Sequence, residues 1–204
     1  MKKIFLDIET LPAEKEKHEI LKTIHDRKKE KRYYSQKLVT FEEFVEQTGL
    51  DGSFGRICCL SYAINNEKVK TLSGNEKEIL KDFWEIAKDV DLFIGFNLID
   101  FDMRFIYQRS IIHGVQPSKD LNFARYRNSP MYDVMWEWCK WSSNRPNLDA
   151  LAKALGFVSS KGGEIEGKNV AKAYEQGRIK EICKYCEADV ELTRNIYKKI
   201  NFEK

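Results

Sequence analysis

Acidic residues at three separated places are the side chains of this sequence that could do chemistry. They fall in three short motifs: Asp7-Ile8-Glu9, Asn97-Leu98-Ile99-Asp100-Phe101-Asp102 and Tyr185-Cys186-Glu187-Ala188-Asp189. Carboxylates gathered in one place repel one another and lose hydration, so a folded protein that gathers them usually binds a cation there. Mg²⁺ and Mn²⁺ prefer oxygen ligands. If the three motifs meet in space, they predict a divalent-metal site.

Taken singly, the first two motifs have ordinary structural explanations. Asp7 and Glu9 are two residues apart on an expected strand and share one of its faces, while Ile8 faces the opposite layer. Asp100 is well placed to cap the helix that follows it. Asp102 lies in the first turn of that helix, where the helix dipole stabilises a negative charge. Neither motif establishes a function by itself.

The third motif lies on a long expected helix. Tyr185 and Asp189 are four residues apart, so their side chains project from the same face. A lone tyrosine and aspartate in this arrangement are more often structural than catalytic. The chemical prediction therefore rests on the combination of acidic residues at two strand exits with an aligned Tyr/Asp pair on a late helix.

The strands and helices that must position these motifs follow an order along the chain: strands come first, and helices are interleaved with them later. Strands are expected over residues 2–9, 57–65, 68–72 and 92–96, with Asn65-Asn66 as the turn of a hairpin. Helices are expected over residues 76–88, 101–113, 147–155 and 179–200. Asn75 and Asn147 are expected to cap the first and the third of these helices, and Gly114 and Gly156 to end the second and the third. This order predicts an α/β fold with a mixed sheet covered by helices.

Length and composition predict one domain. A chain of 204 residues can bury one core, which gives a single domain over 1–204 with a charged helical insert at about 13–52. With 42% hydrophobic residues and no segment approaching a membrane span, a membrane partner is not expected. The first apolar run stops at Asp7, which argues against export, and five cysteines without an export signal predict reduced thiols and a cytoplasmic location. A net charge of +3 neither establishes nor excludes a nucleic-acid partner.

Two segments interrupt the expected core. Residues 22–32 of the insert carry six basic side chains against two acidic ones, and Tyr33-Tyr34 follow directly. Such a helix could hold a phosphate backbone and stack a base, although a solvated helix at the edge of the domain is favoured. Residues 159–169, rich in Gly and Lys, are expected to form a plain loop, with closure over a substrate as the alternative.

A CxxC motif, Cys183-Lys184-Tyr185-Cys186, could bind zinc or act as a redox pair. Zinc needs about four ligands, and the other three cysteines lack a matching pair spacing. A redox site would want the motif at the start of a helix that follows a strand, whereas this motif lies inside an expected helix. Both cysteines are expected to point away from the face of Tyr185 and Asp189. We therefore predict half-buried structural thiols.

Together the acidic motifs resemble those of a known family. Asp7-x-Glu9, Asn97-x-x-x-Phe101-Asp102 and Tyr185-x-x-x-Asp189 match, in order and residue type, the three motifs of DnaQ-like 3′–5′ exonucleases of the DEDDy subgroup. The runs Asp7-Ile-Glu-Thr-Leu-Pro and Asn147-Leu-Asp-Ala-Leu-Ala-Lys-Ala-Leu-Gly look most like stand-alone relatives of the exonuclease domain of family B DNA polymerases. The resemblance covers nearly the whole chain apart from 13–40. It implies a ribonuclease H-like fold, a five-stranded mixed sheet with helices on both faces, in which the three motifs converge at one sheet edge.

The resemblance also implies hydrolysis of phosphodiester bonds by a mechanism with two divalent metal ions, Mg²⁺ or Mn²⁺. Asp7 would bridge the two ions, Glu9 and Asp189 would complete the site that generates hydroxide, and Asp102 would hold the second ion partly through water. Tyr185 would position the attacking water, because a phenol with a reference pKa of about 10 is a poor general base at neutral pH. The candidate substrate-binding residues follow or belong to these motifs: Thr10, Leu11, Asn97 and Phe101.

The implied substrate is nucleic acid with a single-stranded 3′ end, with DNA favoured over RNA although the side chains do not decide between them. A replication or repair partner fits a chain too short to include a polymerase of its own. The alternatives are a non-catalytic nucleic-acid-binding module that keeps the fold and a structural module of a replication or repair complex. The sequence does not fix an oligomeric state.

Overall fold

The computed structural model describes residues 1–31, 39–123, 130–159 and 163–203. Part of the basic and aromatic segment of the insert, Arg32, Tyr33 and Tyr34, lies outside these residues, as do 160–162 of the Gly- and Lys-rich segment.

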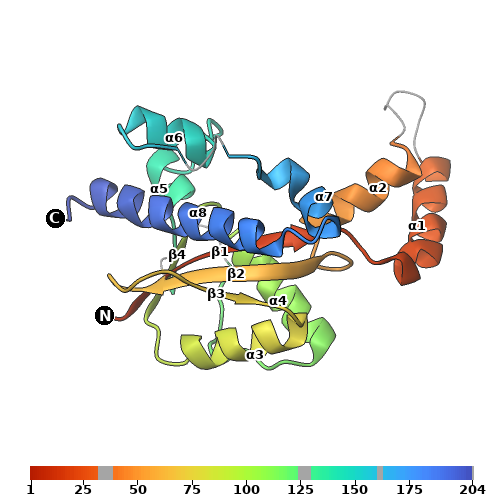
Figure 1. Ribbon diagram of the computed structural model, residues 1–204, viewed down its shortest axis with the longest axis horizontal. Helices are drawn as coiled ribbons and strands as arrows, with labels where there is room; N and C mark the ends of the chain where they lie inside the picture. Colours follow the sequence, from red (N-terminus) through yellow and green to blue (C-terminus); the bar gives the residue numbers. More distant parts are fainter. Residues whose placement is uncertain (32–38, 124–129, 160–162, 204) are drawn as a thin grey trace.

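A five-stranded mixed sheet of order β3-β2-β1-β4-β5 lies at the centre of the fold (Figure 1). Its strands are β1 Lys3–Leu11, β2 Arg56–Ile64, β3 Lys70–Ser73, β4 Leu92–Gly95 and β5 Met131–Asp133. β2 is antiparallel to both β1 and β3, whereas β4 is parallel to both β1 and β5. The carboxyl ends of β1, β4 and β5 consequently point the same way, toward one edge of the sheet.

Helices cover both faces of this sheet, which confirms the predicted fold class. The α-helices are α1 His18–Lys31, α2 Phe41–Gln47, α3 Glu76–Ala87, α4 Asp102–His113, α5 Val134–Cys139, α6 Leu148–Ala154, α7 Val170–Glu175 and α8 Ile179–Ile200, and the short 3₁₀ helices are η1 Lys15–Lys17, η2 Thr48–Leu50 and η3 Gly167–Asn169. α3 and α4 lie on one face, and α5 to α8 lie on the other (Figure 1). None of the helices in this described part is both long and apolar enough to cross a bilayer.

Strand β1 carries different chemistry on its two faces. Its even-numbered side chains pack into the core beneath α3 and α4: Ile4, Leu6 and Ile8. On the other face, Phe5 packs beneath α8 against Tyr197, with ring centroids 5.3 Å apart. Asp7 and Glu9 follow Phe5 at intervals of two and so share its face, as the strand period predicts. One strand thus supplies both a core layer and two carboxylates.

Most long elements begin and end where the sequence pattern predicts. The expected helix over 179–200 is α8, and Asn75 and Asn147 cap α3 and α6 by accepting backbone N–H groups. Gly114 and Gly156 follow α4 and α6 with φ of 64° and 80°, a conformation that glycine adopts without strain. The pattern missed β5, α5 and α7, because elements of three and six residues are too short to show a period.

A network of polar side chains fixes α4 against α3 and β2. Glu76, at the start of α3, accepts hydrogen bonds from Arg109 Nε at 2.9 Å and Arg109 Nη2 at 2.7 Å. It also accepts the backbone N–H of Ile57 at 2.7 Å and lies 2.7 Å from His113 Nε2. Burial opposes the charge of Glu76, but these hydrogen bonds outweigh burial and lower its pKa. The helix that begins at Asp102 is therefore held at its far end by a charged, half-buried cluster.

The two helices of residues 13–52 pack on each other at one end of the molecule (Figure 1). His25 of α1 is 5% exposed, and its Nε2 lies 2.9 Å from the carbonyl oxygen of Val39. Its ring lies 5.3 Å from that of Phe44 of α2. The basic side chains described on α1 are exposed, which agrees with a solvated helix: Lys22, Arg27, Lys28 and Lys29.

Candidate active site

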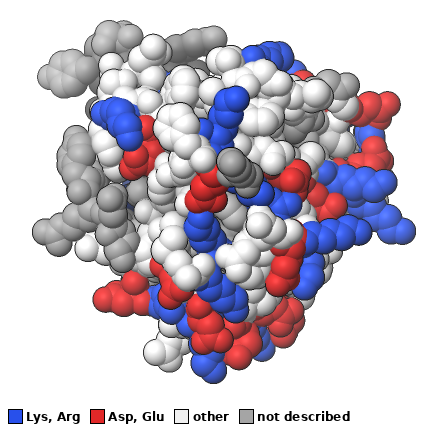
Figure 2. All heavy atoms as spheres, turned by 90° about the vertical axis from the view of Figure 1, so that its left-hand side faces the viewer, with Lys and Arg blue, Asp and Glu red and all other residues white. Residues whose placement is uncertain are grey.

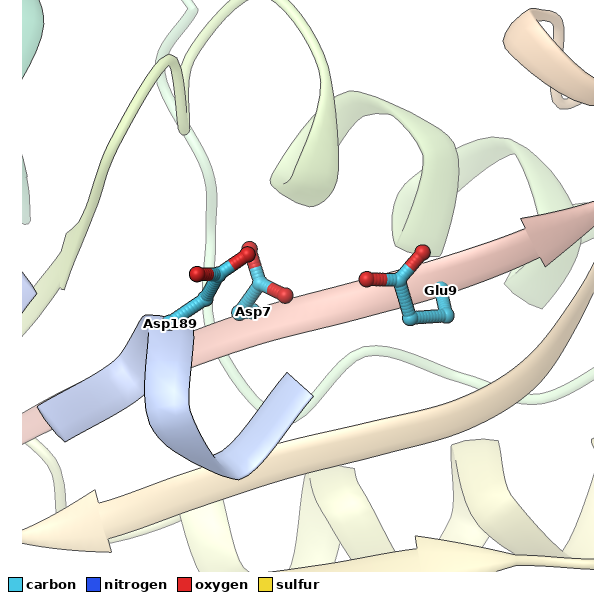
Figure 3. A group of neighbouring side chains, drawn as sticks. All are labelled: Asp7, Glu9 and Asp189. Carbon is cyan, nitrogen blue, oxygen red and sulfur yellow. The ribbon is translucent and has the colours of Figure 1, made fainter. Parts of the chain in front are cut away.

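Three carboxylates from two elements meet on the α8 side of the sheet. Each of Asp7, Glu9 and Asp189 offers an oxygen atom, and these oxygens all lie within 4.8 Å of one another. Figure 3 shows the Asp189 carboxylate of α8 against that of Asp7, with the Glu9 carboxylate further along β1 on the same side of the strand. Three hard oxygen donors at this spacing fit Mg²⁺ or Mn²⁺. The first and third acidic motifs therefore form a group that could hold a metal ion.

Asp189 faces the sheet because it belongs to the buried stripe of α8. Most of the buried residues of this helix recur at intervals of three, four and one, the pattern of a helix packed on a core: Ile182, Cys186, Asp189, Val190, Thr193, Ile196 and Tyr197. Leu192 and Arg194 are also buried. The stripe passes over β1 and β2, and Asp189 is 7% exposed. A carboxylate placed on an apolar stripe is directed at whatever lies beneath it, which here is Asp7.

Asp102, the first residue of α4, approaches the same place from the β4 side of β1. Its Oδ1 accepts the backbone N–H of Ile8 at 3.1 Å. This N–H is available because β4 pairs with β1 only from Lys3 to Phe5, so beyond that point the side chain of Asp102 takes the place of a strand. Asp102 is 3% exposed, and within the described residues it is not part of the 4.8 Å group formed by the other three carboxylates. The second motif thus lies beside the group and is held by the backbone between Asp7 and Glu9.

Burial and mutual repulsion raise the pKa of these carboxyl groups. The pKa of Asp7 is well above its usual value, first because of burial and then because of Cys186, Asp102, Glu9 and Asp189. The pKa of Glu9 is raised by burial and next by Cys186 and Asp189. Burial raises the pKa of Asp102 to about 8, although the hydrogen bond from Ile8 opposes this shift. Such a cluster keeps protons unless a cation supplies the opposite charge.

Tyr185 lies half-buried beside the carboxylates. Its pKa is raised, first by burial and then by the charges of Asp189 and Glu9. A phenol in this environment stays protonated at neutral pH, so Tyr185 can donate a hydrogen bond and orient an oxygen atom, but it cannot act as a general base.

Asp100 does not cap α4, and that prediction is wrong. No side chain makes a cap hydrogen bond at the start of α4, where Phe101 has φ −125° and ψ −81°. Asp100 Oδ2 instead accepts a hydrogen bond from Trp136 Nε1 of α5 at 3.2 Å. The irregular backbone before the helix turns this carboxylate toward a neighbouring helix, which a propensity for helix starts does not reveal.

Cys186 also differs from the sequence prediction, which placed it away from the acidic face. Its Sγ lies 3.3 Å from Asp7 Oδ2 and 3.4 Å from the carbonyl oxygen of Asp7. Cys186 is three residues before Asp189 and four after Ile182, so all three share the buried stripe of α8. The spacing of Tyr185 and Asp189 predicted a face of α8 that includes Asp189, but it did not show that Cys186 lies on the same buried face.

Asp133 is a buried residue at this sheet edge that the sequence did not single out. It ends β5 and is 2% exposed. Its carboxylate accepts the backbone N–H groups of Asn97 at 3.0 Å and Ile99 at 3.0 Å, and those of Met135 and Trp136 at 3.1 and 3.3 Å. Burial raises its pKa to about 6, against these hydrogen bonds. Asp133 therefore fixes the turn that delivers Asp102, and its sole sequence signal is an aspartate just before a short helix.

The predicted substrate-binding residues occupy different environments. Thr10 is half-buried and donates its hydroxyl to the carbonyl oxygen of Gly49 at 2.6 Å. Leu11 is 2% exposed within the core under α7 and α8, which counts against a side-chain contact with substrate. Asn97 has φ 60°, a conformation that asparagine tolerates better than most residues. Phe101 is partly exposed and packs on Phe105 with ring centroids 5.7 Å apart.

An open groove of about 670 Å³ begins at Thr10. One wall comes from α2 and η2, with Glu43 and Leu50, and the other from η3 and α7, with Lys168 and Lys172. The groove therefore joins the end of β1, which carries the acidic residues, to the insert. On the different face drawn in Figure 2, basic and acidic side chains are intermixed over most of the surface, so charge there does not mark a nucleic-acid site.

Comparisons with known proteins identify the family and the fold of this chain. A family model described as a predicted 3′–5′ exonuclease related to the exonuclease domain of PolB matches residues 53–203, which begins after the first acidic motif and the insert. A family B DNA polymerase from the hyperthermophilic archaeon Pyrobaculum calidifontis matches in structure with a TM-score of 0.68 and 14% identity, over 98% of this chain and 24% of the polymerase chain. At that identity the likeness shows the fold alone, and it confirms the ribonuclease H-like expectation. A sequence comparison with curated proteins gave no match.

The raised pKa of Asp102 predicts how stability depends on pH in the metal-free protein. Its folded pKa of about 8 lies above its ordinary value of 3.8, so the protonated carboxyl stabilises the fold. This contribution is complete below the ordinary value and is lost as pH rises through about 8. Asp102→Asn keeps an oxygen acceptor for Ile8 and should flatten the fall in stability between pH 5 and about 9, measured by urea unfolding in chelator. Asp82→Asn, on the exposed face of α3, is the control, and an unchanged pH slope in Asp102→Asn would contradict the prediction.

Proposed function

Because the chain belongs to the family of predicted 3′–5′ exonucleases related to the exonuclease domain of PolB, we propose that it removes nucleotides from the 3′ end of nucleic acid. The proposed substrate has a single-stranded 3′ end, with DNA favoured over RNA, and the cofactors are two divalent ions, Mg²⁺ or Mn²⁺. The observation that carries the proposal is the group of Asp7, Glu9 and Asp189, whose oxygens lie within 4.8 Å beside the Tyr185 hydroxyl.

Four carboxylates would hold the metal ions: Asp7, Glu9, Asp102 and Asp189. Asp7 suits the central position, because its pKa responds to the charges of Asp102, Glu9 and Asp189 together. When bound, the ions lower the pKa of the attacking water and neutralise charge on the attacking and leaving oxygens. The backbone N–H of Ile8 donates a hydrogen bond of 3.1 Å to the Asp102 carboxylate and holds it in place, so this ligand is ordered before an ion binds.

Tyr185 is proposed to orient the attacking water. Its hydroxyl lies beside Asp189 and stays protonated, because burial and neighbouring negative charge raise its pKa. A donor of this kind fixes the position of a water oxygen and leaves proton removal to the metal-bound site. The proposal therefore needs no histidine base.

The groove beside Thr10 is proposed to receive the nucleotides that precede the 3′ end. Its volume of about 670 Å³ accommodates a short single-stranded segment, and Lys168 and Lys172 place positive charge along one wall. Phe101 and Asn97 are proposed to contact the terminal nucleotide from the Asp102 side. In this proposal residues 1–204 act as a single exonuclease domain, and the insert at about 13–52 forms the second wall of the groove.

The biological setting stays a prediction. The chain covers 24% of the matched polymerase chain, and a replication or repair partner is kept within the proposal. The cytoplasmic location follows from the cysteine usage of the sequence alone. The main alternative is a nucleic-acid-binding or structural module without catalysis.

Asp7→Ala should abolish the activity without unfolding the protein. The wild type should shorten single-stranded DNA from its 3′ end with Mg²⁺ or Mn²⁺ and stop with chelator. Asp7→Ala should lower kcat by at least about 10²-fold, because it removes a metal ligand. Its melting temperature in chelator should not fall, since one repelling charge is gone. Asp82→Ala should behave as the wild type.

Several outcomes separate the proposal from its alternative. Full activity in Asp7→Ala would refute the metal-site assignment. A melting temperature that rises with Mg²⁺ in the wild type but not in Asp7→Ala, without any cleavage of DNA or RNA, would favour the non-catalytic module. Matched DNA and RNA oligonucleotides in the same assay decide the substrate polymer.

Tyr185→Phe should slow the reaction and leave metal binding intact. The substitution removes a hydroxyl but keeps the ring that packs against the core under α8. We expect kcat to fall by about 10- to 100-fold, comparable to the loss of one orienting hydrogen bond. The rise in melting temperature on adding Mg²⁺ should match that of the wild type. Equal rates for the two proteins would remove tyrosine from the mechanism.

Replacing the groove lysines should weaken substrate binding more than turnover. In the double variant Lys168→Ala/Lys172→Ala, KM for a single-stranded oligonucleotide should rise several-fold, with kcat changed by less than about 2-fold. The slope of log KM against log salt should fall by about 1.4, because each of the two lost contacts with a single strand contributes about 0.7. Lys81→Ala, exposed on α3 across the sheet, is the matched control. A KM equal to that of Lys81→Ala would place the substrate elsewhere.

A further inference from the structure

The two cysteines of the CxxC motif have no role in the proposed reaction, yet the fold brings two more cysteines to them. Cys183 and Cys186 of α8 lie over Cys58 and Cys59 of β2, and all four belong to or pack against one core cluster. Each of the four is a free thiol. The sequence spacing gave no second pair of cysteines close to the CxxC motif. In the fold that pair comes from β2, more than 100 residues away in the sequence.

A β-bulge turns both cysteines of β2 toward α8. Glu9 pairs with Cys59 and Thr10 pairs with Ile57, so Cys58 is the extra residue of the bulge. Adjacent residues on a regular strand face opposite layers, whereas here Cys58 and Cys59 lie in the same cluster. Cys58 Sγ donates to the carbonyl oxygen of Glu9 at 3.3 Å, which leaves Cys59 as the β2 thiol that meets α8.

Cys59 and Cys183 meet in this cluster from two different elements. Cys59 is one of its buried members from β2, and Cys183 packs against it from α8. Cys59 is 0% exposed, whereas Cys183 is partly exposed. The neighbouring thiol of Cys59 lowers the pKa of Cys183 below its usual value, which favours the thiolate. An accessible thiolate backed by a buried thiol has the arrangement of a reactive and a resolving cysteine.

We propose that Cys183 and Cys59 form a reversible disulfide on exposure to a peroxide, tying α8 to β2 next to the acidic group. The Cys183 thiolate attacks hydrogen peroxide, breaking the O–O bond to give a sulfenic acid and hydroxide. The Cys59 thiol then attacks the sulfenic sulfur, and water leaves with the Cys59 proton. Two thiols are oxidised and one peroxide is reduced to two waters.

The other pairings in the cluster are disfavoured by geometry. Cys183 and Cys186 are three apart on one helix, where Cβ atoms are about 5–6 Å apart, beyond the usual disulfide range of about 3.5–4.5 Å. Cys58 and Cys59 are chain neighbours, and Cys58 is engaged with the backbone of Glu9. Cys186 is directed at Asp7, with Sγ 3.3 Å from Oδ2. Cys59 and Cys183 remain as the pair from different elements.

The consequence for the acidic group rests on the proposed function. Covalently joined sulfur atoms approach more closely than hydrogen-bonded thiols, so the bond draws Cys183 toward β2. Tyr185 is two residues further along the same helix, and Asp189 is one turn beyond it. A displacement of about 1 Å in a reacting group can lower a rate by about 10²-fold. Oxidation is therefore expected to lower exonuclease activity, and a thiol reductant to restore it.

The disulfide is tested by mass and does not depend on activity. The purified protein is treated with hydrogen peroxide, remaining thiols are alkylated, and the digest is searched for a cross-linked pair of peptides. We expect a mass loss of about 2 Da, for two hydrogens, and a link between residues 59 and 183 that dithiothreitol removes. Cys183→Ser and Cys59→Ala should abolish the link. Cys139→Ser, which changes the partly exposed cysteine outside the cluster, should retain it.

Activity and metal binding are measured on the same samples. Oxidised wild type should lose at least about 10-fold in rate and recover with reductant, whereas Cys183→Ser should keep its rate under peroxide. The Mg²⁺-induced rise in melting temperature provides a readout of the site if no nuclease activity is found. No link between 59 and 183, or a link only between 183 and 186, overturns the proposal. A 59–183 link that changes neither rate nor the Mg²⁺ response overturns the coupling to the acidic group.

Discussion

Repulsion among buried carboxylates is the constraint on which the rest of this structure depends. Asp7, Glu9 and Asp189 hold oxygens within 4.8 Å of one another, and Asp102 lies beside them under the backbone of Ile8. Burial and mutual charge raise the pKa of Asp7, Glu9 and Asp102, so the metal-free arrangement is electrostatically unfavourable. The surrounding fold must supply the free energy that keeps these groups together. A bound cation would offset their repulsion and stabilise the ionised carboxylates.

The strand and the two helices that bear these carboxylates, β1, α4 and α8, are each fixed by contacts away from the carboxylates themselves. β1 is a central strand with a core layer on its other face, so its two carboxylates cannot move apart without breaking that layer. The helix that begins at Asp102 is fixed by the Glu76 network near its end and by the hydrogen bonds that Asn97 and Ile99 donate to Asp133 just before its start. α8 is fixed by a buried stripe that runs along its length. The site is thus ordered by contacts that need no metal.

The predictable part of this molecule is the part governed by local periodicity. The period of α8 and the alternation of β1 placed Tyr185, Asp189, Asp7 and Glu9 on the correct faces, and Asn75 announced α3. The wrong predictions depended on tertiary contacts instead. Asp100 accepts a hydrogen bond from Trp136 because of an irregular turn, and Cys186 meets Asp7 because the buried face of α8 packs on β1. Asp133 was missed because its partners are backbone groups of a segment more than 30 residues away.

The acidic group and the thiol cluster are two results of one packing arrangement. The buried stripe of α8 passes first over the bulged end of β2, where it meets Cys58 and Cys59, and then over β1, where it meets Asp7. Cys186 lies at the junction and belongs to both, since it touches Asp7 and is buried in the same core cluster as Cys59. A 22-residue helix is stiff over one turn, so a displacement at Cys183 cannot be absorbed before Tyr185 and Asp189. Chemistry at the thiols therefore reaches the carboxylates through the helix itself, without any further moving part.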